Sequence, residues 1–203
     1  MFQIHAVTSA QSSESIEALS DHIVALLPYV DAVQIREKSR SPKAIAALLE
    51  LILKQTDASQ LIINDRADIA MALGLTRVHL TESSVPLGHL QKALPHFRFG
   101  RSFHSAQQIM NELPCYDYGY IGHIYPTAQK IYPPFGLEKL QNLAANRPQG
   151  QLIAIGGIDE INITNVAPYV DGVAVMSGFF AKSIEESIAH AINLRSLAMH
   201  VIA

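Results

Sequence analysis

The chain has 203 residues, of which 49% are hydrophobic and 16% charged, and its formal net charge is -3 at pH 7. This balance excludes a disordered chain and gives no sign of a general affinity for nucleic acid, so small-molecule partners are expected. The length predicts one domain over residues 1–203, near the lower end of the range for an α/β barrel.

Cysteine usage and hydropathy restrict the class of protein further. The single cysteine, Cys115, excludes an intramolecular disulfide and a cysteine-rich metal site, and it indicates a reducing compartment. The first residues lack a basic start followed by a long apolar run, and no stretch approaches the ~18 apolar residues that a membrane span needs. We therefore expect a cytoplasmic protein without membrane contact.

Short apolar runs rich in strand-forming residues recur every ~20 to 30 residues. Between them, apolar residues are spaced as on one face of a helix, for example Ile45, Leu48 and Ile52. The pattern predicts eight β-α units. The expected strands, in chain order, cover residues 2–8, 31–36, 60–64, 77–80, 97–102, 117–122, 151–157 and 171–178.

Strands that alternate with helices are parallel, because each helix returns the chain to the same end of the sheet. Eight such units predict one closed (β/α)8 TIM barrel of the α/β class rather than an open sheet. Ser41, which precedes Pro42, and Asp159 are expected helix N-caps. The fourth unit is the weakest, because its strand is short and its helix contains Gly88.

Two glycine-bearing turns are expected where the last two strands end. Gly156 and Gly157 leave room for backbone N–H groups to approach an anion, and Met176, Ser177 and Gly178 lead directly into a helix. A glycine pair alone often serves only a tight turn. Two such turns after strands seven and eight, on the face where barrels bind ligands, predict a phosphate site.

Cations are expected at the same mouth of the barrel. Arg36 and Lys38 flank Glu37 where the second run ends, Arg101 lies in the fifth run, and Lys130 follows the sixth. Such a charged run is usually a solvated turn with an internal ion pair. In a barrel, the four cations would instead converge on one polyanionic ligand.

Asn64 and Asp65 follow the third run and have two interpretations. Asp65 either caps the next helix, with Asn64 directed into the pocket, or binds magnesium, which prefers further carboxylate and phosphate oxygens. The next loop offers only Glu82 among serines, so we expect no dedicated metal site. The histidines form no HxH or HExxH pattern that would indicate zinc.

His123 lies between a glycine and a short apolar run at the end of the sixth strand. A lone histidine beside apolar residues is more often structural than catalytic, and from the residues alone both interpretations stay open. His104 is the one other histidine expected near the rim. A structural role is expected for the histidines inside strands or on helices: His5, His22, His79 and His190.

Six motifs, in order and at about the right spacing, resemble the thiamin phosphate synthase superfamily: VQIREK, IINDRADIA, GRSFHS, GHIYPTAQK, AIGGI and GVAVMSGFF. The resemblance spans nearly the whole chain. It implies a TIM barrel of the thiamin phosphate synthase type that binds a thiazole phosphate. The implied ligand-binding residues are Arg36, Lys38, Asn64, Arg101, Ser102, Thr127 and Lys130, with the phosphate at Gly156, Gly157, Met176, Ser177 and Gly178.

Two branches of this superfamily differ at the motifs that matter. The synthase typically has a second magnesium aspartate where this chain has Ser84, and GPIFPTxTK where this chain has His123 and Gln129. A histidine at the proline position resembles the thiazole tautomerase (TenI) branch, in which that histidine is the catalytic acid-base. The residues that keep part of the synthase pattern are Asp65, Thr127 and Lys130.

The resemblance therefore implies an isomerase that needs no cofactor or metal. In this reaction His123 moves a proton between two carbons of a carboxythiazole phosphate, which makes the ring aromatic. Thiamin phosphate synthase, and a regulatory protein that only binds the thiazole phosphate, stay as alternatives. Apolar residues expected at the surface permit a homodimer: Phe179, Phe180 and residues 132–135.

Overall fold

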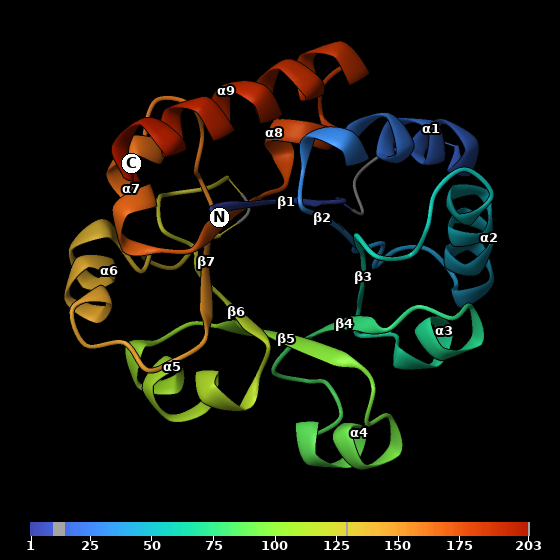
Figure 1. The fold of residues 1–203 in the computed structure, drawn as a ribbon, viewed down its shortest axis with the longest axis horizontal. Coiled ribbons are helices and arrows are strands. Elements are labelled where there is room, and N and C mark those ends of the chain that lie inside the picture. The colour runs from blue at the N-terminus through green and yellow to red at the C-terminus, as the bar shows by residue number, and fades with distance from the viewer. Residues whose placement is uncertain (10–14, 129, 203) are drawn as a thin grey trace.

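The computed structural model describes residues 1–9, 15–128 and 130–202. Eight parallel strands form a closed barrel in chain order, with β8 pairing back onto β1. Figure 1 looks along this ring of strands. The expected (β/α)8 barrel is confirmed. The strands are β1 (Gln3–Val7), β2 (Ala32–Ile35), β3 (Leu61–Asn64), β4 (Arg77–Leu80), β5 (Arg98–Phe103), β6 (Tyr118–Gly122), β7 (Gln151–Ile155) and β8 (Gly172–Val175).

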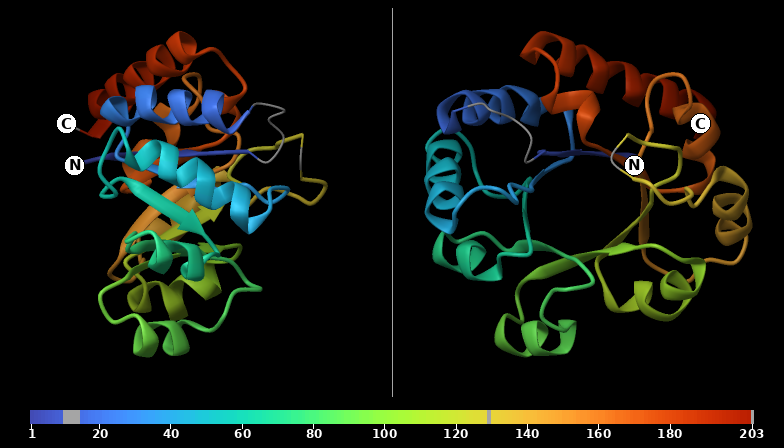
Figure 2. Two further views of the ribbon diagram at one scale, coloured as in Figure 1. Left: turned by 90° about the vertical axis from the view of Figure 1, so that its right-hand side faces the viewer. Right: turned by 180° about the vertical axis from the view of Figure 1, so that it is seen from behind.

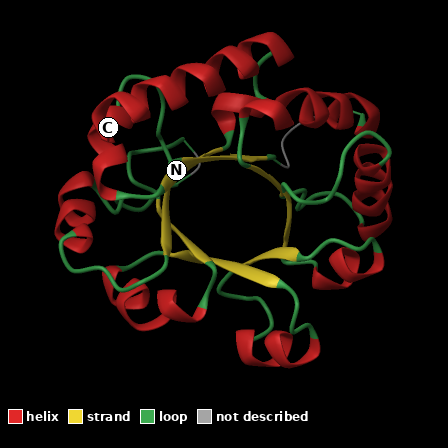
Figure 3. Ribbon diagram, in the orientation of Figure 1, coloured by secondary structure: helices red, strands yellow, loops and turns green. Residues whose placement is uncertain are grey.

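Helices surround the ring of strands, as the red and yellow elements of Figure 3 show. Short 3₁₀ turns follow α1, α5 and α7 at Leu27–Tyr29, Leu113–Cys115 and Ala167–Tyr169. The helices are α1 (Ile16–Leu26), α2 (Pro42–Leu53), α3 (Ala67–Ala72), α4 (Leu87–Ala93), α5 (Ala106–Glu112), α6 (Leu137–Ala144), α7 (Ile163–Val166), α8 (Ser177–Phe180) and α9 (Ile184–Ile202).

Of the two predicted helix caps, one is confirmed and one is wrong. The Ser41 hydroxyl accepts a hydrogen bond from the Ala44 N–H at 3.2 Å, and Pro42 opens α2. The Asp159 carboxylate instead accepts from the Ile161 N–H at 2.9 Å, which closes a turn, and α7 begins only at Ile163. A capping residue stabilises either arrangement, so its presence alone does not place the helix start.

The barrel interior contains a hydrogen-bonded layer of two histidines and two tyrosines. His5 Nδ1 lies 2.8 Å from Tyr120 Oη, while His79 contacts Tyr118 Oη at 3.1 Å and Ser102 Oγ at 2.8 Å. Burial is the main cause that lowers the pKa of each imidazole to about 3, so both are neutral at pH 7. The structural role expected for these two histidines is confirmed.

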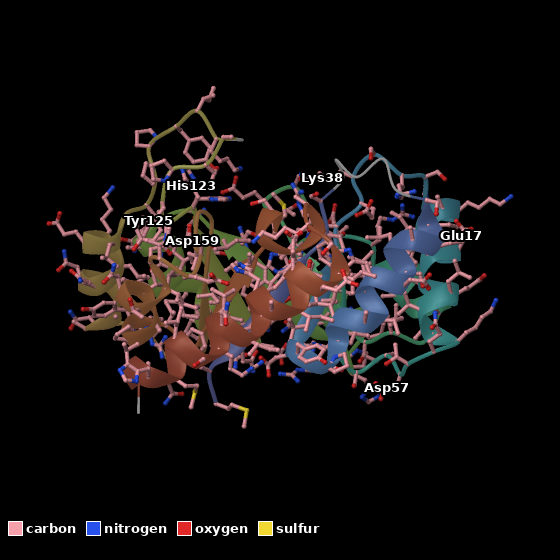
Figure 4. All side chains as sticks on the ribbon, turned by 90° about the horizontal axis from the view of Figure 1, so that it is seen from above. Glu17, Lys38, Asp57, His123, Tyr125 and Asp159 are labelled. Carbon is pink, nitrogen blue, oxygen red and sulfur yellow. The ribbon has the colours of Figure 1, made fainter. Side chains whose placement is uncertain are left out.

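The two ends of the barrel are distinct. In the left view of Figure 2, both chain termini lie at one end and the β6–α6 loop projects from the other. Figure 4 places His123 and Lys38 at the same rim and Asp57 at the opposite one. We call the rim formed by the loops after the C-terminal strand ends the mouth.

The surface argument for a homodimer is largely wrong. Phe179 and Phe180 are buried in the core between barrel and helices, with exposed fractions of 0% and 5%, and Phe135 is buried as well. Of the residues named for that surface, Tyr132 and Pro133 are exposed. No helix in the described part of the chain is long and apolar enough to cross a membrane.

Candidate active site

Arg36 and Lys38 lie at the mouth without the internal ion pair that a charged turn usually has. The carboxylate between them, Glu37, is buried and pairs with Arg40, whose Nε lies 3.0 Å from Oε2. Among the ion pairs of residues 1–9, 15–128 and 130–202, none includes Arg36 or Lys38. Their charges are therefore available to a ligand.

Electrostatic coupling shows which groups share this side of the mouth. The pKa of Lys38 is lowered first by the charge of Arg36, then by desolvation and by Lys130, while Asp65 raises it. Desolvation also lowers the pKa of the half-buried Arg36. Three of the four predicted cations thus lie together, with one carboxylate in reach.

Arg101 is not at the mouth, contrary to the expectation. Inward and outward side chains alternate along β5, so Gly100 and Ser102 face the interior while Arg101 faces α5. Its guanidinium pairs with Glu112 and donates to Tyr116 Oη at 3.0 Å. Arg101 therefore joins the barrel to its helical coat and does not contribute to the cation cluster.

Two amide side chains line the interior just below the mouth. Asn64, predicted to point inward, accepts a hydrogen bond from Gln34 Nε2 at 2.9 Å. Gln34 is 2% exposed, and its Oε1 has no hydrogen-bond partner among the described residues. Gln34 was missed from the sequence, although a glutamine two positions before Arg36 in an otherwise apolar strand could have indicated an inward polar group.

Asp65 does not cap the next helix, and its side chain bonds to a serine instead. Asp65 has a φ of 60°, and α3 begins after Arg66 with no side-chain cap. Its Oδ1 accepts a hydrogen bond from Ser84 Oγ. Glu82 in the same loop accepts from Gln108 of α5 at 3.2 Å instead.

The contacts of Asp65 bear on whether magnesium could bind at this rim. Asp65 is the carboxylate that acts on Lys38, and one of its oxygens is already bonded to Ser84. No group of three or more histidine, cysteine, aspartate or glutamate side chains that could hold a metal occurs in the part of the chain that the structure describes. Magnesium normally takes carboxylates together with substrate phosphate oxygens, so any metal here would depend on its ligand.

His123 is buried at the mouth with both ring nitrogens unpaired. Its peptide bond to Gly122 is cis, and the β6–α6 loop covers it, so the side chain is 6% exposed. Neither Nδ1 nor Nε2 has a hydrogen-bond partner among residues 1–9, 15–128 and 130–202. A buried imidazole normally finds a partner, as His5 and His79 do.

The surroundings of His123 favour its neutral form. Desolvation lowers its pKa first and the Lys130 charge second; an interaction with the Tyr132 backbone, too poorly aligned or too long to count as a formed hydrogen bond, raises it, and His104 lowers it again. The neutral imidazole therefore persists at pH 7 and can accept a proton. Because Lys130 also acts on Lys38, His123 and the cation cluster share one rim.

The β6–α6 loop forms a cover that begins and ends at His123. The Phe135 N–H donates to the His123 carbonyl at 2.7 Å, and the Lys130 N–H donates to the Thr127 carbonyl at 3.2 Å. The Tyr132 ring meets the imidazole edge-on at 5.0 Å and lies 5.3 Å from Lys130 Nζ. Tyr132 was not predicted as a site residue, and Gln129 lies outside the described residues.

The two glycine turns lie next to each other, because β7 pairs with β8. Gly156 and Gly157 have φ of 99° and 70°, which side chains rarely adopt, and a Cβ on Gly156 would overlap His123. Met176, Ser177 and Gly178 follow β8 at the start of α8, with Ser177 exposed. The structure thus brings the predicted phosphate residues to the mouth beside His123.

Together these groups can bind an anion and move a proton. Backbone turns and three cations provide the positive side, and a neutral imidazole with two free nitrogens provides the acid-base group. Such a combination suits proton transfer at a carbon of a phosphorylated ligand.

The chain is similar to known proteins over most of its length. The model of the TMP-TENI family, described as thiamine monophosphate synthase, matches residues 4–179. The thiamine-phosphate synthase of Chlorobium luteolum is 34% identical over 174 residues, which is 80% of each chain. That of Albidiferax ferrireducens is 36% identical over 179 residues, 83% of this chain and 78% of the relative.

Solved structures show the same fold. Thiamine phosphate pyrophosphorylase from Pyrococcus furiosus superposes with a TM-score of 0.80 at 22% identity, covering 100% of this chain and 98% of its own. The same-named protein from Bacteroides thetaiotaomicron gives 0.75 at 19% identity, covering 97% and 98%.

Proposed function

The chain belongs to the TMP-TENI family of thiamine monophosphate synthases, and from this premise we propose that it is an enzyme of thiamin biosynthesis acting on a thiazole phosphate. Within the family, we assign it to the thiazole tautomerases. The reaction converts 2-[(2R,5Z)-2-carboxy-4-methylthiazol-5(2H)-ylidene]ethyl phosphate to the aromatic 2-(2-carboxy-4-methylthiazol-5-yl)ethyl phosphate.

The observation that carries the assignment is the unpaired imidazole of His123. It occupies the covered part of the mouth, beside the Gly156 turn, and its pKa is lowered mainly by desolvation. A structural histidine in such a place would be hydrogen-bonded, whereas a proton carrier needs a free nitrogen.

His123 can carry both proton transfers of this isomerisation. The neutral imidazole removes the proton from the ring carbon that bears the carboxylate, and the resulting imidazolium returns it to the exocyclic carbon. The double bonds shift into the ring, and no atom is gained or lost. Acid-base transfers of this kind contribute about 10²- to 10⁴-fold to the rate.

The cations would stabilise the charge that develops between the two transfers. Removal of the ring proton adds a negative charge to a ligand that already carries a carboxylate and a phosphate. Arg36, Lys38 and Lys130 surround this region, and fixed charges in a desolvated site lower the energy of such an intermediate. Asn64, Ser102 and Thr127 are the further proposed ligand contacts.

Thiamin phosphate synthase is the second candidate, and the names of the relatives favour it. Two of them, at 34% and 36% identity, are called thiamine-phosphate synthases, and Asp65, Thr127 and Lys130 keep part of that pattern. The site departs from the synthase at Ser84, which bonds Asp65 where a second carboxylate is expected, and at His123. These departures are why we place the tautomerase first.

Two incubations of the purified protein separate the candidates. With the carboxythiazolylidene phosphate alone, a tautomerase produces the absorbance of the aromatic thiazole without added metal. With pyrimidine pyrophosphate, thiazole phosphate and Mg²⁺, a synthase releases pyrophosphate and thiamin phosphate. Turnover only in the second incubation would replace the proposed function by the synthase. Tight binding of the thiazole phosphate without turnover in either would leave a regulatory protein.

A further inference from the structure

His190, near the middle of α9, lies directly behind both glycine turns. In Figure 1, α9 runs across α8 and ends beside α7, and contacts join α9 to both helices. The His190 side chain is 5% exposed. One edge of its imidazole meets the segment that follows β7, and the other meets the segment that follows β8.

The first edge is bonded to Glu160, three residues beyond the Gly157 turn. His190 Nδ1 lies 2.9 Å from Glu160 Oε1, and Asn193 Nδ2, one helical turn later, donates to the same oxygen at 3.2 Å. The hydrogen bond from His190 is the main cause that lowers the pKa of the Glu160 carboxyl. Two side chains of α9 therefore hold this segment.

The second edge packs against the backbone of Gly178. A Cβ on Gly178 would lie 2.7 Å from His190 Nε2, so only glycine allows the imidazole this close. The Phe179 ring meets the imidazole edge-on at 5.4 Å. Nε2 is buried and has no hydrogen-bond partner among the described residues.

We infer that His190 is a positioning residue that fixes the separation of the two phosphate-binding turns and so sets the affinity for the ligand's phosphate. This inference rests on the proposed function, because it takes the turns to bind a thiazole phosphate. His190 does not touch the reacting atoms. It acts through Glu160 on one turn and through Gly178 on the other.

The physical reason is that a phosphate bound between two turns needs N–H groups from both at the same time. The turns belong to different β-α units, and the pairing of β7 with β8 ends at Ile155 and Ala174, before either turn begins, so this pairing leaves their relative tilt free. A residue that contacts both removes this freedom before the ligand binds, which lowers the entropic cost of binding. The direct effect is expected on the phosphate, because the two turns are its proposed binding groups.

The test compares two ligands that differ only in the phosphate. Dissociation constants are measured by calorimetry for 2-(4-methylthiazol-5-yl)ethyl phosphate and for the corresponding alcohol, on the full chain. The wild-type protein should bind the phosphate much more tightly than the alcohol. Both the tautomerase and the synthase handle this phosphate tail, so the comparison does not depend on which reaction is catalysed.

His190→Leu introduces an apolar side chain of comparable bulk and removes both nitrogens. We expect it to weaken binding of the phosphate roughly ten- to hundredfold and to leave binding of the alcohol unchanged. In turnover assays the loss should be in KM rather than in kcat. His190→Asn keeps a donor toward Glu160 and should recover part of the lost affinity.

His200→Leu is the matched control, because His200 lies on the exposed face of the same helix and contacts neither turn. If His190→Leu does not fold, the same two dissociation constants are measured on Glu160→Ala. Glu160 is partly exposed, so this variant should fold, and the substitution removes the bond that ties the segment after β7 to His190. An unchanged ratio of phosphate to alcohol affinity in the folded variant would overturn the role of His190. Wild-type protein that does not prefer the phosphate would overturn the proposed function and this inference with it.

Discussion

The histidines of the barrel interior and the histidine at its mouth have little exposed surface but differ in their partners. His5 and His79 are each bonded through both ring nitrogens, whereas neither nitrogen of His123 is bonded within the described residues. Burial alone therefore does not separate a structural imidazole from a reactive one. A free nitrogen at the mouth does, because a proton can be accepted only where no other group occupies the lone pair and a ligand can reach it.

The largest expected effect is the loss of activity when His123 is replaced. In His123→Ala we expect kcat of tautomerisation to fall about 10²- to 10⁴-fold, because the proton carrier is lost. The melting temperature should fall less than in His5→Ala, since neither ring nitrogen of His123 has a hydrogen-bond partner among the described residues. Initial rates followed by thiazole absorbance, with thermal unfolding of the same sample, check both parts. Wild-type kcat in the variant would remove His123 from the mechanism.

His5→Ala should give the opposite result. The substitution leaves the buried Tyr120 hydroxyl and the Gln3 amide without their partner and opens a void in the barrel. We expect the free energy of unfolding to fall by about 2–4 kcal/mol, while kcat of the folded protein stays within about twofold. Urea unfolding measures the first quantity. A variant as stable as the wild type would show that this interior layer adds nothing to stability.

The interior histidines also predict how the protein responds to acid. Their pKa is about 3 in the folded barrel, against 6.5 in an exposed histidine, so below pH 6.5 the unfolded chain binds more protons than the folded one. Above pH 6.5 both states hold these histidines neutral, and toward pH 3 the free energy of unfolding falls by roughly 4 kcal/mol for each of them. The double variant His5→Gln and His79→Gln should lose less stability over this range, as urea unfolding at several pH values will show.

The smallest predicted effect concerns the acid limb of the pH–rate profile, where kcat/KM falls as the pH is lowered. Neutral His123 is the active form and Lys130 helps to lower its pKa, so wild-type kcat/KM should fall only below pH 6.5. Lys130→Met removes the nearby charge, which should move this limb by a fraction of a pH unit toward higher pH. A limb that stays in place or moves the other way would mean that Lys130 does not act on the imidazole.

Features that depend on local pattern could be predicted from the sequence, and features that depend on packing could not. The alternation of strands and helices predicted the barrel, and strand ends predicted where Arg36, Lys38 and the glycine turns would lie. Arg101 was misplaced although its flanking Gly100 and Ser102 carry the inward pattern that excludes it. That error was avoidable.

Other contacts join distant parts of the chain, and no local pattern contains them. Ser84 bonds Asp65 across 19 positions, and His190 reaches Glu160 across 30. In the sequence, His190 cannot be distinguished from any other histidine on a helix. Its contacts with Glu160 and Gly178 form only when α9 packs behind β7 and β8. The unpaired state of His123 depends in the same way on how the β6–α6 loop folds over it.

The most direct test is an NMR titration of the imidazoles in one sample, with and without the carboxythiazole phosphate product. The account predicts that His123 titrates below pH 6.5 and that its signals shift when the ligand binds. His5 and His79 should stay neutral down to about pH 3 and should not respond. A His123 signal that ignores the ligand, or that titrates at or above pH 6.5, would contradict its role as the proton carrier.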